Sequence, residues 1–165
     1  MKEHFAMMAA YNGWANTRIY AAAGRLPDGD YRADLKSFFG SIHRTLNHIL
    51  VADTLWMARF GGTPVPDWRL DHIVHEAFAD LTLARTAMDR AIVEHVGAQT
   101  DQSLAATFTY TPVTNPEPVT QKMAPALAHF FNHQTHHRGQ CHAMLTRLDV
   151  EAPALDLIYF QRETA

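Results

Sequence analysis

The chain has 165 residues, of which 47% are apolar and 19% charged, and its formal net charge is −3 with the histidines neutral. These values fit one globular domain over residues 1–165 and leave no basic surface for nucleic acid. The single cysteine, Cys141, excludes an internal disulfide, and because no stretch reaches the roughly 18 apolar residues of a membrane span, we expect a cytoplasmic protein that does not bind membranes.

Helical periodicity predicts two long helices in the first half of the chain. Apolar and small residues recur every three or four positions from Lys2 to Arg25, and Leu26–Asp30 then supplies Pro and Gly to end that helix. A second helix is expected from about Phe38 to Phe60. Gly61–Pro66 ends it, since glycine and proline favour a loop.

A third helix is expected from about Asp71 to Val96, with Gly97 as its stop. The following segment, Ala105–Pro118, differs in kind because Thr107–Thr111 is rich in β-forming residues and a turn signal comes later. It is expected to be an extended connection or a short hairpin. Such a long crossover allows the third and fourth helices to lie in a non-sequential order.

The fourth long helix is expected from Val119 or Gln121 to Leu148, with Pro125 in its first turns, where proline is best tolerated. A last short segment, Ala154–Gln161, is also a candidate helix. No internal repeat or change of composition indicates a second domain. The sequence therefore predicts an all-α protein built as one helical bundle.

The last long helix carries an unusual density of histidines. Five of the eleven in the chain lie within fourteen positions: His129, His133, His136, His137 and His142. Histidines four apart share a helix face, so His133 can bind one metal ion together with either His129 or His137. His129 and His137 are about 12 Å apart along the axis and cannot share an ion. His136 is offset by about 100° and is expected on another face.

Two imidazoles leave a metal ion under-coordinated, so another helix must contribute a ligand. The second predicted helix holds His43 and His48, which are five residues apart, so at most one faces the same point. Spacing does not choose between them. A weaker candidate pair is formed by His72 and His75, which Glu76 follows. The favoured interpretation of that segment is an exposed helix start.

Three segments of the chain resemble the DinB family, a group of DinB/YfiT-like metalloenzymes. Tyr11–Asn16 is similar to the first-helix pattern of that family. Ser41–Leu50, followed by Asp53 and Trp56, resembles its second helix, and His133–Gln140 resembles its most specific segment. The resemblance extends along nearly the whole chain.

By that resemblance the metal ligands are His48, His133 and His137. It also implies a four-helix bundle of up-down-down-up topology, with a long, partly extended connection before the last long helix, and a homodimer. Three imidazoles leave a coordination position for water or substrate, which is typical of a catalytic site. Imidazole suits several divalent ions, so zinc, nickel, iron and manganese all remain candidates.

The leading hypothesis for function is a metal-dependent enzyme acting on a small-molecule substrate. The metal would activate water or a low-molecular-weight thiol, as in a hydrolase or a thiol-dependent transferase. Two alternatives remain. One is a metal-binding protein without catalysis, and the other is a helical interaction protein.

Four further polar residues are candidates for supporting roles. Asn12 and Asn16 lie four apart in an apolar stripe and could hydrogen-bond a ligand of the metal, with capping or surface exposure as the alternative. Asp53 could orient a ligand histidine, or be a solvated acid. Arg138 could pair with an anionic substrate, or form a salt bridge. Cys141 is expected to be buried and inert rather than a ligand or nucleophile.

Overall fold

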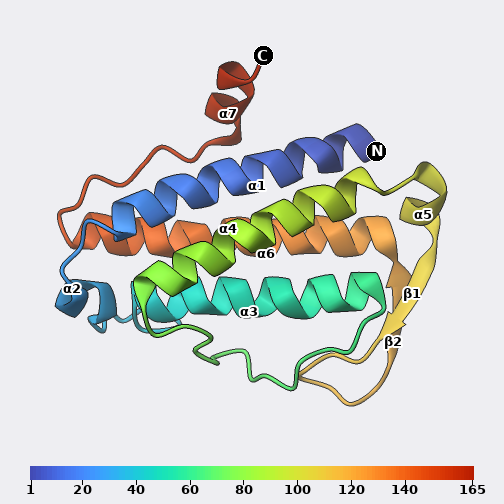
Figure 1. Cartoon of the computed structure of the whole chain (residues 1–165), viewed down its shortest axis with the longest axis horizontal. Coiled ribbons are helices and arrows are strands. Elements are labelled where there is room, and N and C mark those ends of the chain that lie inside the picture. Colours follow the sequence, from blue (N-terminus) through green and yellow to red (C-terminus); the bar gives the residue numbers. More distant parts are fainter.

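Four helices of at least 20 residues make up most of the fold in the computed structural model, which describes residues 1–165 (Figure 1). They are α1 (Lys2–Ala23), α3 (Ile42–Gly61), α4 (Phe78–Gly97) and α6 (Met123–Arg147). Figure 1 shows α1 and α6 running in one direction and α3 and α4 running in the other. The mostly helical fold predicted from the sequence is confirmed, with one small two-stranded sheet added to it.

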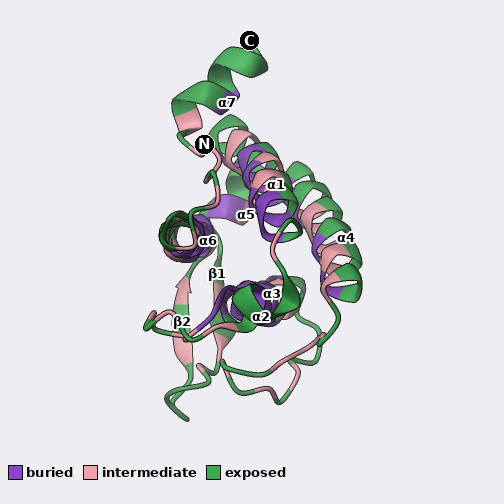
Figure 2. Ribbon diagram, turned by 90° about the vertical axis from the view of Figure 1, so that its left-hand side faces the viewer, coloured by how far each residue is buried: buried purple, intermediate pink, exposed green.

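The core lies between these four helices as two apolar clusters. α1 packs against α4 and α6, and α3 packs against the same two helices. One cluster includes Ile19, Leu46 and Leu145, and the other, toward the opposite ends of the helices, includes Phe5 and Phe130. Figure 2 shows buried residues on the faces that the long helices turn toward one another. This apolar burial accounts for the helical periodicity of the sequence.

The second long helix begins at Ile42, later than the predicted start at Phe38. Ser41 caps it, because its hydroxyl accepts a hydrogen bond from the backbone N–H of Arg44 at 3.2 Å. Just before the cap, Gly40 adopts a φ of 83°, which is incompatible with a right-handed helix. Phe38 therefore lies outside the helix in a turn and is 82% exposed.

The third long helix begins at Phe78, seven residues later than predicted. The side-chain oxygen of Asn47 on α3 accepts the backbone N–H groups of Val74 at 2.9 Å and His75 at 3.0 Å. These bonds hold the segment before α4 as a loop against α3. His72 and His75 are therefore not one turn apart on a helix, and the spacing argument for them as a ligand pair does not apply.

The predicted extended segment is a hairpin. Strand β1 (Thr107–Tyr110) pairs antiparallel with β2 (Val119–Lys122). α6 begins at Met123 because the residues expected to form its first turn pair with β1 instead. Pro125 does lie in the first turn of α6, as predicted.

Three short helices complete the chain: α2 (Asp28–Arg32), α5 (Asp101–Ala105) and α7 (Leu157–Glu163). The predicted C-terminal helix is thus present but begins three residues later. It lies beside α1 (Figure 1), where the buried ring of Phe160 packs against Tyr11 at a centroid distance of 5.9 Å. No helix combines the length and the apolar character needed to cross a membrane.

Cys141 is fully buried in the first apolar cluster, as predicted. Burial raises the pKa of its thiol to about 12, so the reactive thiolate is scarce near neutral pH. We expect a thiol reagent at pH 8 to leave native Cys141 unmodified and to modify it fully in concentrated urea. Rapid labelling of the folded protein, followed by mass spectrometry, would contradict this burial.

Candidate metal centre

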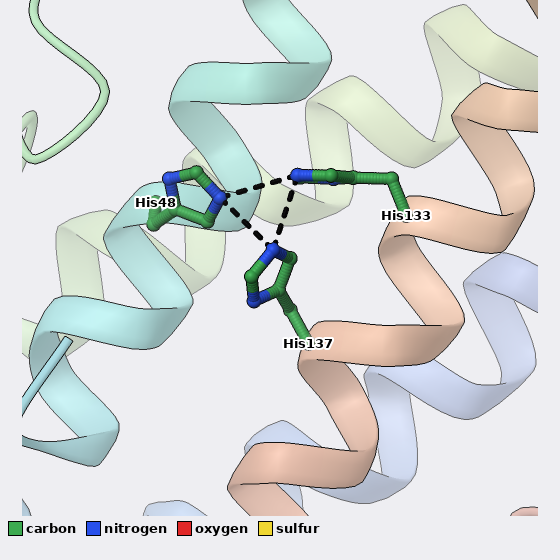
Figure 3. A group of neighbouring side chains, drawn as sticks. All are labelled: His48, His133 and His137. Carbon is green, nitrogen blue, oxygen red and sulfur yellow. Dashed lines mark hydrogen bonds between the residues drawn. The ribbon is translucent and has the colours of Figure 1, made fainter. Parts of the chain in front are cut away.

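Three histidines from two packed helices converge on one point (Figure 3). His48 comes from the middle of α3, and His133 and His137 come from successive turns of α6. The Nε2 atom of His48 lies 3.3 Å from that of His133 and 3.2 Å from that of His137, and the last two are 3.1 Å apart. His48 and His137 are only 3% and 7% exposed, and His133 is half-buried.

In two of these rings, the hydrogen-bond partner of the Nδ1 atom indicates which ring nitrogen carries the hydrogen. His48 Nδ1 is 2.7 Å from the backbone oxygen of Leu70, and His137 Nδ1 is 2.8 Å from the side-chain oxygen of Gln140. Both oxygens can only accept, so each Nδ1 must carry the ring hydrogen. In the neutral rings both Nε2 atoms then present lone pairs to each other at 3.2 Å. That contact is repulsive unless a cation lies between them.

The local environment favours the neutral form of all three rings. Burial lowers the pKa of His48 to about 4, against the hydrogen bond to Leu70 that favours the charged form. Burial, helped by the two neighbouring rings, lowers the pKa of His133 to about 3, and burial also lowers the pKa of His137. Neutral imidazole is the form that binds a metal ion.

The spacing of the three nitrogens suits a shared ion. Atoms 3.1–3.3 Å apart can all lie about 2.0–2.1 Å from a single metal ion. The three-histidine cluster is therefore compatible with a metal site.

The other candidate histidines lie elsewhere. His129 is exposed, with its ring centroid 6.0 Å from that of His133, so the structure pairs His133 with His137 instead. His43 is buried against the ring of Tyr31, 5.3 Å between centroids. His136 is exposed, as its offset from His137 predicted. The resemblance-based choice of His48 over His43 agrees with this arrangement.

Three residues that contact the cluster were not predicted from the sequence as part of the site. The ring of Phe39 stacks on His48 with centroids 3.9 Å apart and covers one side of the cluster. The Leu70 carbonyl belongs to a loop whose fold no local pattern revealed. Gln140 was more accessible to prediction, because it lies three residues after His137 and therefore on the same helix face.

A cavity of about 260 Å³ borders the cluster on the His48 and His133 side. Its walls include Trp56 and Arg59 from α3 and residues 112–114 from the hairpin connection. A larger cavity, about 510 Å³, lies between α1, α6 and residues 154–157, but none of the three histidines lines it. The smaller cavity therefore places a small molecule beside the cluster, and the larger one does not.

Asp53, a candidate for orienting a ligand histidine or for a solvated acid, is buried and has other partners in the structure. One carboxylate oxygen accepts from Arg85 at 2.6 Å and the other accepts from Gln134 at 2.9 Å. Arg85 also lies 2.9 Å from the carboxylate of Asp89. Asp53 and Arg85 are fully or nearly fully buried, so these charges stabilise each other away from water.

Asn12, Asn16 and Arg138 extend the same network rather than contacting the histidines. The amide groups of Asn12 and Asn16 donate to Asp89 at 3.1 and 2.9 Å, and their oxygens accept from Arg138. The network joins α1, α3, α4 and α6 between the two apolar clusters. In the sequence, such a network is indicated by polar residues within apolar helical stripes. Arg85 also lies on a buried helix face, but it was not among the predicted candidates.

Comparisons with known proteins agree with this arrangement of helices and histidines. The family model described as DinB family matches residues 1–164. Protein DinB of Bacillus subtilis (strain 168) is 27% identical over 150 residues, which cover 82% of this chain and 80% of that protein. A DinB-like protein from Bacillus cereus ATCC 10987 shares the fold, with a TM-score of 0.70 at 18% identity over 92% of this chain and 95% of that one. Because the family model spans nearly the whole sequence, the chain belongs to the DinB family.

Proposed function

We propose that His48, His133 and His137 hold one divalent metal ion and that the protein is a metal-dependent enzyme. Its reaction is the activation of water or a low-molecular-weight thiol against a small-molecule substrate, as in a hydrolase or thiol-dependent transferase. The observation that carries the proposal is the convergence of the three Nε2 atoms at 3.1–3.3 Å, with the outer nitrogens of His48 and His137 held by oxygen acceptors. The homodimer and the up-down-down-up four-helix bundle implied by the family resemblance belong to the same proposal.

The residues around the cluster would have different roles in such a site. When bound, a divalent ion lowers the pKa of a coordinated water or thiol and so supplies a nucleophile near neutral pH. The Leu70 carbonyl and Gln140 hold two imidazoles with their Nε2 atoms turned inward. Phe39 shields the rings on one side, and the cavity beside His48 and His133 leaves another side open to a small molecule.

Metal content and metal-dependent turnover test the proposal together. Purified protein should contain about one divalent ion per chain, and chelation should abolish turnover in a screen of thiols with electrophiles and of esters and amides. Returning the metal should restore it. The helical circular dichroism signal should survive chelation, because the apolar clusters include none of the three histidines.

The alternative outcomes separate the competing functions. Full metal occupancy without turnover on any of these substrates would indicate a metal-binding protein that is not an enzyme. A protein that binds no zinc, nickel, iron or manganese would contradict the site itself.

A further inference from the structure

Arg59 differs from the other enclosed arginines of this protein. Arg85 is paired with Asp53 and Asp89, and Arg138 donates to two asparagines. Arg59 forms no ion pair and donates to no side chain, although it is only partly exposed.

The guanidinium of Arg59 is held in place while most of its hydrogen-bonding capacity stays unused. Its carbon lies 4.9 Å from the ring centroids of both Trp56 and Tyr110, which fix it by cation–π contacts. Among its five N–H groups, one Nη2 hydrogen donates to the backbone oxygen of Thr111 at 3.4 Å, and the buried Nε has no partner. Burial lowers the pKa of Arg59, and no ion pair offsets that burial.

Arg59 and the histidine cluster line the same cavity. Eleven residues separate Arg59 from His48 on α3, or about three helical turns and 16 Å of rise, so both lie on one face. Ala52 and Trp56 lie between them on that face and also line the cavity. The small side chain of Ala52 leaves room for a ligand, and Trp56 offers it an apolar wall.

We propose that this cavity takes a small carboxylate-bearing molecule, with its carboxylate on Arg59 and its reacting end at the histidine cluster. This inference rests on the proposed function and names the substrate class for it. A monoanion is favoured because the cavity offers one arginine, and a carboxylate matches the two-pronged donor geometry of a guanidinium. The apolar walls suit an aliphatic or aromatic middle section.

The test compares charged and neutral probes of equal length. Protein loaded with Co²⁺ is titrated calorimetrically with ω-mercaptoalkanoates of three to eight carbons and with their methyl esters. We expect one chain length to bind at least about 10-fold more tightly as the acid than as the ester, since hydrogen bonds to a charged group have this magnitude. A cobalt–thiolate absorption band should report that the sulfur reaches the metal.

Substitutions then assign the preference to Arg59. Arg59→Gln should bring the acid-to-ester ratio close to one, Arg59→Lys should retain part of it, and Arg162→Gln, at an exposed arginine on α7, should leave it unchanged. Ala52→Val should weaken acid and ester alike. A purely structural role for Arg59 predicts lower thermal stability in Arg59→Gln with the ratio intact, and that result would overturn the inference.

The experiment distinguishes a wrong substrate class from a wrong proposed function. Protein that takes up Co²⁺ but binds acid and ester equally refutes only the carboxylate assignment. Protein that takes up no Co²⁺ removes the proposed function and this inference together.

Discussion

His137→Ala should weaken the binding of a divalent metal ion by at least about 100-fold, whereas His136→Ala should leave it nearly unchanged. The expected loss exceeds the 10–100-fold typical of removing a mere supporting hydrogen bond, because one of only three ligands disappears. His136 is the matched control, since it is the adjacent residue on the same helix and its ring is exposed. Competition with a chromophoric chelator measures the affinity of each variant.

The remaining histidines make the same test specific to the cluster. His48→Ala and His133→Ala should behave like His137→Ala, and His129→Ala should behave like the control. Circular dichroism of each variant checks that the helices are intact. Equal metal affinity in the His137 and His136 variants would refute the assignment of the ligands.

Asp53→Ala should lower the free energy of unfolding by about 3–5 kcal/mol, the cost typical of breaking a buried ion pair. The substitution leaves Arg85 buried with only Asp89 to compensate its charge, and it removes the acceptor of Gln134. Urea denaturation followed by circular dichroism measures the change. Asp71→Ala is the matched control, because Asp71 pairs with Arg69 at the surface, where water screens the interaction.

A double substitution separates the charge from the packing. Asp53→Ala combined with Arg85→Leu should recover part of the lost stability, because the unpaired cation is then absent. If Asp53→Ala changes stability no more than Asp71→Ala does, the buried network does not hold the four helices together.

Helix periodicity in the sequence was sufficient to place the middles of the four long helices, because each buries one apolar stripe whatever its neighbours are. The helix starts depended on contacts that periodicity does not record. Asn47 on α3 holds the backbone before Phe78 as a loop, and β1 pairs with residues predicted to begin the last helix. In both cases the partner lies outside the helix whose start it determines.

The sequence by itself also determined that His133 shares a helix face with a second histidine, since spacing of four is a property of any α-helix. It left both the choice of His129 or His137 and that of His43 or His48 open, and only the resemblance to a family chose between them. The packing of α3 on α6 determines which histidines meet, because it brings His48 to within 3.2–3.3 Å of both His133 and His137.

For the polar residues within the apolar stripes, too, the sequence identified the residues and the tertiary structure determined their partners. The sequence marked Asn12, Asn16, Asp53 and Arg138 as candidates for supporting the metal site or a substrate, Asn12 and Asn16 because they are polar residues within an apolar stripe. Tertiary structure decided otherwise, giving them hydrogen bonds to one another and to Arg85, Asp89 and Gln134 across four helices. A buried polar group requires a partner, and which group becomes that partner depends on which helices pack together.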